Sequence, residues 1–294
     1  MGETRNPKSE TRIKPEIRMT NQVRNQKPEM STIKLAITGA CGRMGRRLIA
    51  LAHADKAFQL VAAIDRPECA ELAQDAGQLA GIGPIGIPIT FDLRPKPDVL
   101  IDFTLPAGMR HWLKTCRDRE IGMVIGTTAL KDKDHAAIDI AAADIPILQS
   151  PNMSVGVNVL LKLAAQAAKS LGEEYDIEIV EGHHRFKKDA PSGTALAIAD
   201  AILKATGKTR KSLAYGRHGD DTQRQAGQIG MHSLRIGDEV GKHTVYFATL
   251  GERVELGHVA TNRDTFAVGA LRAAKWLRNQ KPGRYSLSDA IDLK

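Results

Sequence analysis

Residues 181–196, EGHHRFKKDAPSGTAL, place two histidines, an arginine and two lysines directly before a switch to Pro-Ser-Gly-Thr. His183 and Lys187 stand four positions apart, and either side chain could donate a proton. His184 follows His183, but successive residues of a strand face opposite ways, so the two histidines need not share a role. The histidine and lysine side chains of this segment could therefore help to bind a carboxylate or donate a proton.

The end of the same segment predicts an anion-binding helix start. Ser192 is a suitable N-cap for a helix that begins near Thr194. Gly193 and Thr194 then offer free backbone N–H groups and a hydroxyl to an anion such as a carboxylate. The alternative is a solvated basic loop followed by an ordinary helix cap.

A glycine-rich turn near the front of the chain predicts where a redox cofactor binds. Gly39, Gly42 and Gly45 are spaced G-x-x-G-x-x-G between the apolar segment 33–38 and a segment of helical period. Such glycines allow the tight turn, the approach of a pyrophosphate and the packing of helix on strand. Asp65 lies 20 residues after Gly45, where a carboxylate would hold the ribose hydroxyls.

Arg66 follows Asp65 directly. An acid at this position favours NADH because it repels a 2′-phosphate, whereas a neighbouring arginine can neutralise that phosphate. The pair predicts tolerance of both NADH and NADPH; the alternative for Arg66 is a solvated surface residue.

Alternating strands and helices continue through residues 98–152, with apolar strands at 98–104, 122–128 and 145–152. This pattern predicts an α/β fold of the Rossmann type, a doubly wound parallel sheet whose ligands bind beyond the carboxyl ends of the strands. Phe103, Ser150 and other residues at these ends could line a nicotinamide pocket, although ordinary turn chemistry explains any one of them equally well. The predicted cofactor-binding residues are Gly39, Gly42, Arg43, Met44, Gly45, Asp65, Arg66, Phe103, Thr104, Gly126, Thr127, Thr128, Ser150, Asn152 and Met153.

The pattern changes after residue 152. A long apolar helix is followed by strands of two-residue period, which predicts a second, α+β domain with a mixed or antiparallel sheet. We assign 31–152 to the dinucleotide domain, completed by 263–294, and 153–262 to substrate binding and oligomerisation.

Composition narrows the function classes. The formal charge of +8 suits small anions as well as nucleic acid, but aromatic residues are too scarce for a stacking-type single-strand binder. Cys41, Cys69 and Cys116 are scattered and form no CxxC pair, so neither a disulfide framework nor a zinc site is expected. We therefore expect no metal, no nucleic acid and no membrane partner, and a reducing cytoplasm.

Residues 1–30 are polar, basic and free of apolar runs, which predicts a disordered extension. The alternatives are a basic arm that binds a partner, or a start of translation at Met19 or Met30.

Seven motifs together resemble the 4-hydroxy-tetrahydrodipicolinate reductase family, also called dihydrodipicolinate reductases, from about residue 33 to the C-terminus. They are GACGRMGR, DFT, GTT, PNMSVGVN, EGHHRFKKDAPSGTA, HSLRIGD and ATNRDTFAVGAL. Two positions depart from the family pattern: Ala129 stands where the family often has glycine, and Ser150 where it often has alanine.

The resemblance implies reduction of a cyclic, unsaturated dicarboxylate by NADH or NADPH in diaminopimelate and lysine biosynthesis. It implies that His183 is the acid/base residue and Lys187 the proton donor. It implies that His184, Gly193 and Thr194 bind substrate, with Arg263 in an interdomain hinge. It also implies a homotetramer built through the C-terminal sheets.

Two alternatives remain open. Aspartate- or homoserine-type dehydrogenases share a glycine loop and an α+β domain, but HHRFKKDAPSGT is not their pattern. A non-catalytic sensor of dinucleotides would bind NADH without turnover.

Overall fold

The computed structural model describes residues 1–2 and 32–292. The predicted extension at 1–30 lies outside the described residues, apart from its first two. Among the helices of the described part of the chain, none is long and apolar enough to cross a membrane.

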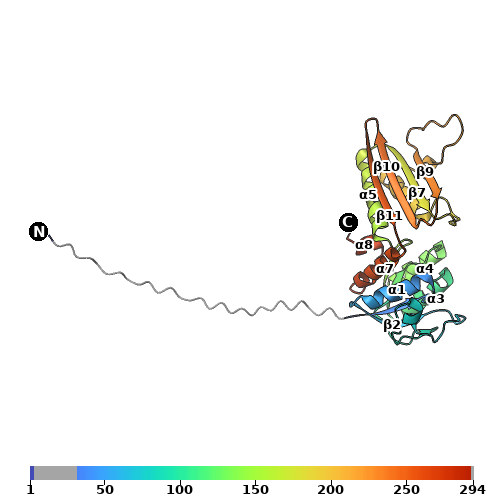
Figure 1. Ribbon diagram of the computed structural model, residues 1–294, viewed down its shortest axis with the longest axis vertical. Helices are drawn as coiled ribbons and strands as arrows, with labels where there is room; N and C mark the ends of the chain where they lie inside the picture. The colour runs from blue at the N-terminus through green and yellow to red at the C-terminus, as the bar shows by residue number, and fades with distance from the viewer. Residues whose placement is uncertain (3–31, 293–294) are drawn as a thin grey trace. The chain divides into compact units, whose positions relative to one another are not determined.

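A seven-stranded parallel sheet forms the first half of the fold (Figure 1). Its strands, in spatial order, are β12 (Gly283–Tyr285), β6 (Pro146–Gln149), β5 (Gly122–Ile125), β4 (Val99–Asp102), β1 (Ile33–Thr38), β2 (Phe58–Ile64) and β3 (Ile89–Thr90). Every residue of β4 and β5 is buried, as expected when helices cover both faces of a parallel sheet.

Alternate residues of each strand point to opposite faces of the sheet and belong to two separate hydrophobic cores. Ile37 and Ile101 belong to the core under α1 (Arg43–Ala54) and α7 (Asp264–Leu277), whereas Ala36 and Leu100 belong to the core under α3 and α4. The latter helices span Pro106–Asp118 and Asp132–Ala142. The doubly wound prediction is therefore confirmed.

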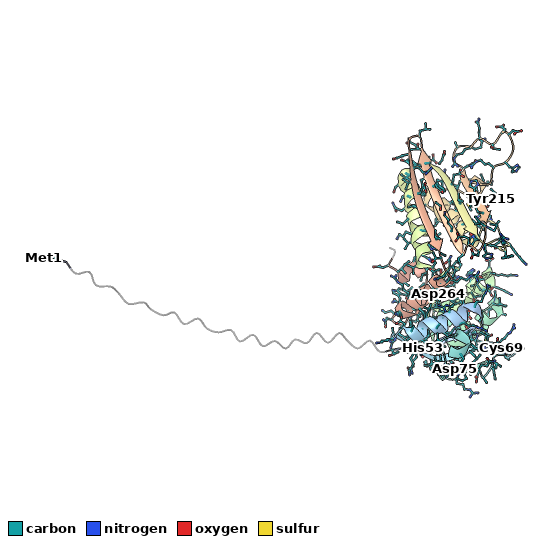
Figure 2. The ribbon with its side chains drawn as sticks, in the orientation of Figure 1. Met1, His53, Cys69, Asp75, Tyr215 and Asp264 are labelled. Carbon is teal, nitrogen blue, oxygen red and sulfur yellow. The ribbon has the colours of Figure 1, made fainter. Side chains whose placement is uncertain are left out.

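Helix α7 joins this half although it is far away in sequence. It lies beside α1 in Figure 1, and Arg47 of α1 forms an ion pair with Asp264, labelled in Figure 2, at 2.7 Å. Two short helices, α2 (Ala76–Ala80) and α8 (Leu287–Ala290), add to the same core.

A five-stranded mixed sheet forms the second half. Its order is β11 (Glu252–Ala260), β10 (Gly241–Thr249), β7 (Asp176–His183), β9 (Ile229–Arg235) and β8 (Leu213–Tyr215). Strand β10 is antiparallel to both neighbours, while β7, β9 and β8 run parallel. This confirms the predicted second sheet.

Helices α5 (Val155–Leu171) and α6 (Gly193–Thr206) pack on one face of this sheet around buried Ile179, Ile198 and Phe247. Ser154 and Ser192 cap the two helices. A single 3₁₀ turn, η1 (Arg210–Ser212), precedes β8.

Candidate functional site

The glycine turn after β1 is shaped as a dinucleotide loop requires. Gly39 has φ +71°, and a Cβ atom on Gly45 would lie 2.1 Å from the carbonyl oxygen of Gly39. Gly42 is the N-cap of α1, whose first turn carries Arg43 and no acidic residue. The turn therefore fits a pyrophosphate, which the N–H groups at the start of α1 would hold.

Asp65, directly after β2, fastens this loop. Its two carboxylate oxygens accept hydrogen bonds from the backbone N–H of Cys41 at 2.8 Å and of Arg66 at 2.9 Å. The Arg66 side chain is exposed. The carboxylate thus lies beside the glycine loop, which is compatible with the predicted ribose contact.

Asp102 is a buried carboxylate at the same sheet edge that the sequence argument did not identify. Its oxygens accept hydrogen bonds from the hydroxyls of Thr38 and Thr104 at 2.7 Å and of Thr127 at 2.5 Å. Burial raises the pKa of Asp102, and the three hydroxyl bonds act in the opposite sense. The predicted cofactor-binding residues Thr104 and Thr127, at the ends of two strands, are therefore both bound to the Asp102 carboxylate.

Phe103 and Gly126 also lie together at these strand ends. A Cβ atom on Gly126 would lie 2.4 Å from the Phe103 ring, so the ring occupies the space that the glycine leaves. Thr128 is exposed, and Ala129, one residue further, has φ +58°. The departure from glycine at position 129 thus places an alanine in a left-handed backbone conformation.

Asn152 links the end of β6 to the start of α6. Its side-chain amide donates to the Thr194 hydroxyl at 2.9 Å, and its oxygen accepts from the backbone N–H of Ser154 at 2.8 Å. The Ser150 hydroxyl donates to the Asn152 carbonyl at 2.8 Å, and Met153 is buried. A predicted cofactor residue and a predicted substrate residue are therefore in direct contact.

Glu181 organises the predicted catalytic region, although it was not among the predicted residues. It is buried on β7, and its carboxylate contacts His183 Nδ1 at 2.5 Å and the Arg235 guanidinium at 3.0 and 3.1 Å. It also accepts the backbone N–H of Ser192 at 3.2 Å. Burial would raise the pKa of Glu181, but its bonds from Arg235 and His183 bring the net pKa below the ordinary value.

His183 is the last residue of β7, so His184 lies beyond the strand rather than within it, because the strand ends one residue earlier than expected. Burial lowers the pKa of His183, and the contact with Glu181 only partly opposes this. His183 is therefore neutral at pH 7. Because Nδ1 donates to the carboxylate, Nε2 is left as an acceptor.

Lys187 lies in the turn after β7. Its Nζ atom is 2.9 Å from the exposed Asp189 carboxylate, and its backbone N–H donates to the carbonyl of His184 at 3.0 Å. Asp189 was not among the residues predicted from the sequence. The buried Nδ1 atom of His184 has no partner among the described residues.

The start of α6 leaves room for an anion. A Cβ atom on Gly193 would meet no atom within 4 Å, and the first turn of the helix contains no acid. The Ser192 hydroxyl accepts the N–H of Ala195 and contacts His243 Nε2 at 3.2 Å. The helix starts at Gly193, one residue before the predicted start.

The residues that the sequence argument missed differ in how they could have been found. Glu181 stands two positions before His183 on one strand, so the two-residue period alone places both on one face. Arg235 pairs with His183 only through the register of β7 and β9, and His243 comes from β10. Predicting the roles of Arg235 and His243 would require the order of the strands in the sheet, which no local sequence pattern encodes.

Comparison with known families gives a direct assignment. The model described as "Dihydrodipicolinate reductase, N-terminus" matches residues 33–153, and "Dihydrodipicolinate reductase, C-terminus" matches residues 156–291. The chain belongs to the dihydrodipicolinate reductase family. The resemblance drawn from the motifs is thereby confirmed.

Individual members of the dihydrodipicolinate reductase family align over nearly their whole length. The 4-hydroxy-tetrahydrodipicolinate reductase of Alkalilimnicola ehrlichii is 50% identical over 267 residues, covering 89% of this chain and 100% of that protein. The enzyme of that name from Nitrosospira multiformis is 47% identical over 269 residues, covering 90% and 100%. A dipicolinate-bound dihydrodipicolinate reductase from Paenisporosarcina sp. TG-14 superposes with a TM-score of 0.68 at 25% identity, covering 88% of this chain and 99% of that one.

Proposed function

We propose that this chain reduces 4-hydroxy-tetrahydrodipicolinate to tetrahydrodipicolinate with NADH or NADPH, in diaminopimelate and lysine biosynthesis. The observation that carries the proposal is the buried Glu181–His183 pair beside the open helix start at Gly193, in a chain of this family. A proton-transferring group and an anion site are therefore adjacent.

The glycine loop, Asp65 and the strand ends around Asp102 would hold the dinucleotide. When bound, the reduced nicotinamide supplies a hydride. The α1 N-terminus would neutralise the pyrophosphate, and Asp65 would accept the ribose hydroxyls. Asp65 next to exposed Arg66 leaves both NADH and NADPH as cofactors.

The start of α6 would bind one substrate carboxylate. The N–H groups of its first turn have no partners within the helix, and Gly193 lets an anion approach them closely. The Thr194 hydroxyl, which already accepts a bond from Asn152, can donate its own proton to the same carboxylate. His184 would contribute a further polar contact.

The division of proton transfer follows from the charge states. His183 is neutral at pH 7, with Nδ1–H bound to Glu181, so it can accept a hydrogen bond at Nε2. Lys187 would then donate the proton that accompanies the hydride, while Asp189 holds its ammonium group in place. This assignment gives the two predicted catalytic residues different tasks.

A coupled assay tests the proposal. The substrate is formed by condensing pyruvate with aspartate semialdehyde, and oxidation of NADH and of NADPH is followed separately by absorbance. We expect oxidation that depends on both precursors and on this chain. Reduction of NAD⁺ or NADP⁺ by aspartate or homoserine, or oxidation of NADH or NADPH by aspartate semialdehyde without pyruvate, would point to the rival dehydrogenases. Cofactor binding without turnover would point to the sensor.

Assembly and location are part of the same proposal. The sheet face turned away from α5 and α6 carries Val180, Leu234, Tyr246 and Val259; Leu234 and Val259 are each 53% exposed. Apolar side chains on an open sheet face favour association with a second copy. We propose a homotetramer in the cytoplasm, to be tested by light scattering after size-exclusion chromatography.

A further inference from the structure

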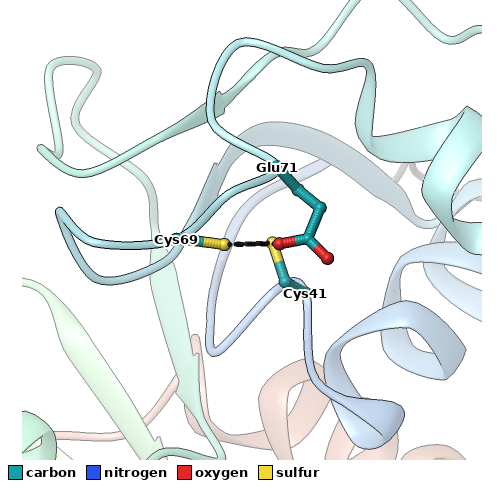
Figure 3. Close-up of side chains that lie close together, drawn as sticks. All are labelled: Cys41, Cys69 and Glu71. Carbon is teal, nitrogen blue, oxygen red and sulfur yellow. Dashed lines mark hydrogen bonds between the residues drawn. The ribbon is translucent and has the colours of Figure 1, made fainter.

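Two cysteines that are 28 residues apart in sequence meet beside the glycine loop (Figure 3). Cys41 Sγ lies 3.0 Å from Cys69 Sγ, and Cys69 Sγ lies 3.1 Å from a carboxylate oxygen of Glu71. The two cysteines are scattered in sequence, but they come together in space because the end of β2 returns the chain to the loop after β1.

We propose that Cys41, Cys69 and Glu71 form a binding site for a thiophilic divalent cation of the Zn²⁺ class. One donor atom from each side chain lies within 4.8 Å of the others. Two thiolates and a carboxylate are donors that zinc accepts, and a water can complete its four-coordinate shell.

The geometry requires little adjustment. Two sulfurs, each about 2.3 Å from a tetrahedral zinc, lie about 3.8 Å apart, so these sulfurs need to separate by about 0.8 Å. Cys41, Cys69 and Glu71 all lie outside helices and strands, so their side chains can move without breaking a backbone ladder. The Cys41 side chain is also free for this role, because it is its backbone N–H that bonds to Asp65.

The carboxylate distinguishes a cation site from a simple thiol pair. A disulfide would use the two sulfurs alone. Here a carboxylate oxygen of Glu71 also lies close to the Cys69 sulfur, where it could become a third ligand. Arg46 contacts the other oxygen of Glu71 at 3.5 Å and donates to the Cys41 carbonyl at 2.9 Å. This guanidinium orients the carboxylate and offsets the negative charge left when three anionic donors hold a divalent ion.

The site is tested by metal titration of the reduced, full-length chain, without cofactor or substrate. We expect one Zn²⁺ per chain with micromolar or tighter affinity, measured by competition with a chromophoric chelator. Substitution of Zn²⁺ by Co²⁺ should give a thiolate-to-metal charge-transfer band. Because neither readout involves turnover, the proposed reductase function and this site can fail independently.

Variants identify the ligands. Cys41→Ser and Cys69→Ser should remove the Co²⁺ band and weaken zinc binding by more than the roughly 10- to 100-fold that loss of a supporting residue costs. Glu71→Gln should keep the band but weaken binding. Cys116→Ser is the matched control, because Cys116 is buried elsewhere, in the α3–α4 core, and should bind as the parent does.

Two results overturn the proposal. One is zinc affinity that is the same in the parent and in Cys41→Ser. The other is a chain whose Cys41 and Cys69 form a disulfide with glutathione disulfide, releasing two glutathione thiols, but whose reduced form gives no Co²⁺ thiolate band. The second result would assign the pair to redox chemistry instead.

Discussion

At the scale of single residues, Glu181 explains why His183, one of the two predicted catalytic residues, can occupy a buried position. The Glu181 carboxylate accepts hydrogen bonds from His183, from Arg235 and from the backbone N–H of Ser192. Each charged group in this cluster therefore has a partner. Removal of Glu181 would leave the half-buried Arg235 guanidinium without its carboxylate partner, which is a costly change inside a protein. The group is therefore expected to be rigid before any ligand arrives.

Lys187→Ala should lower kcat about 10²- to 10⁴-fold, the usual contribution of a positioned general acid, while the Kd for NADH changes little. Steady-state kinetics and a fluorescence titration with NADH measure the two effects. Lys188→Ala is the matched control, since Lys188 is the adjacent exposed lysine. Unchanged turnover in Lys187→Ala would remove that residue from the mechanism.

At this scale, candidate functional residues can be predicted from the sequence when they lie close together in the chain. His183, Lys187 and Gly193 stand in one continuous segment, and the structure places that segment around a strand end and a helix start. Asp102 and Arg235 were not found, because each acts on residues from other strands and its importance appears only once those strands are paired. The roles of His183, Lys187 and Gly193 in catalysis or binding stay predictions.

At the scale of elements, the proposed anion site in the first turn of α6 can be tested without disturbing the rest of the fold. A Cβ atom on Gly193 meets nothing within 4 Å, so Gly193→Ala should leave the melting temperature unchanged or slightly raised. It should raise the KM for the dicarboxylate, since the methyl group would occupy the anion's place. Gly45→Ala is the contrasting variant: its Cβ would lie 2.1 Å from a carbonyl oxygen, so it should destabilise the chain.

The turn after β5 offers a stabilising change. Ala129 has φ +58°, a left-handed conformation that costs a residue other than glycine roughly 1 to 2 kcal/mol. Ala129→Gly should therefore raise the free energy of unfolding by up to about 1 kcal/mol, measured in urea. Ala143→Gly, at an exposed position with φ –67°, should instead lower it. Equal effects of both changes would contradict the explanation.

The order of the larger elements was predictable from period and length, because the strands of the parallel sheet are buried on both faces and the helices between them are amphipathic. The shortest elements were not predicted: α2, β3, β8, β12 and α8. These segments of two to five residues carry too few positions to show a period, whereas the four-residue strands β4, β5 and β6 lie within longer predicted segments.

At the scale of the whole molecule, stability should depend on buried histidines. Burial lowers the pKa of His243 to about 4, with nearby His183 and His258 acting in the same sense and Glu181 opposing. The unfolded chain binds this proton near pH 6.5 and the folded chain only near pH 4, so stability is lost as the pH falls between these values.

His243→Asn should therefore lose less stability than the parent between pH 6.5 and 4, by at most about 3 kcal/mol. Urea unfolding at several pH values measures the difference. His53→Asn is the control, because His53 is an exposed histidine in the last turn of α1, in the other half of the fold. A parent and a His243→Asn variant with parallel pH curves would contradict the assignment.

The place of α7 and β12 has a consequence for how the chain is made. β12 completes the parallel sheet beside β6, and α7 packs into the core of β1 and β4, yet both come from the last quarter of the sequence. During synthesis, the first strands leave the ribosome long before these partners exist. The strands of the parallel sheet are therefore expected to keep part of their apolar surface open to chaperones until residues 264–285 have been synthesised.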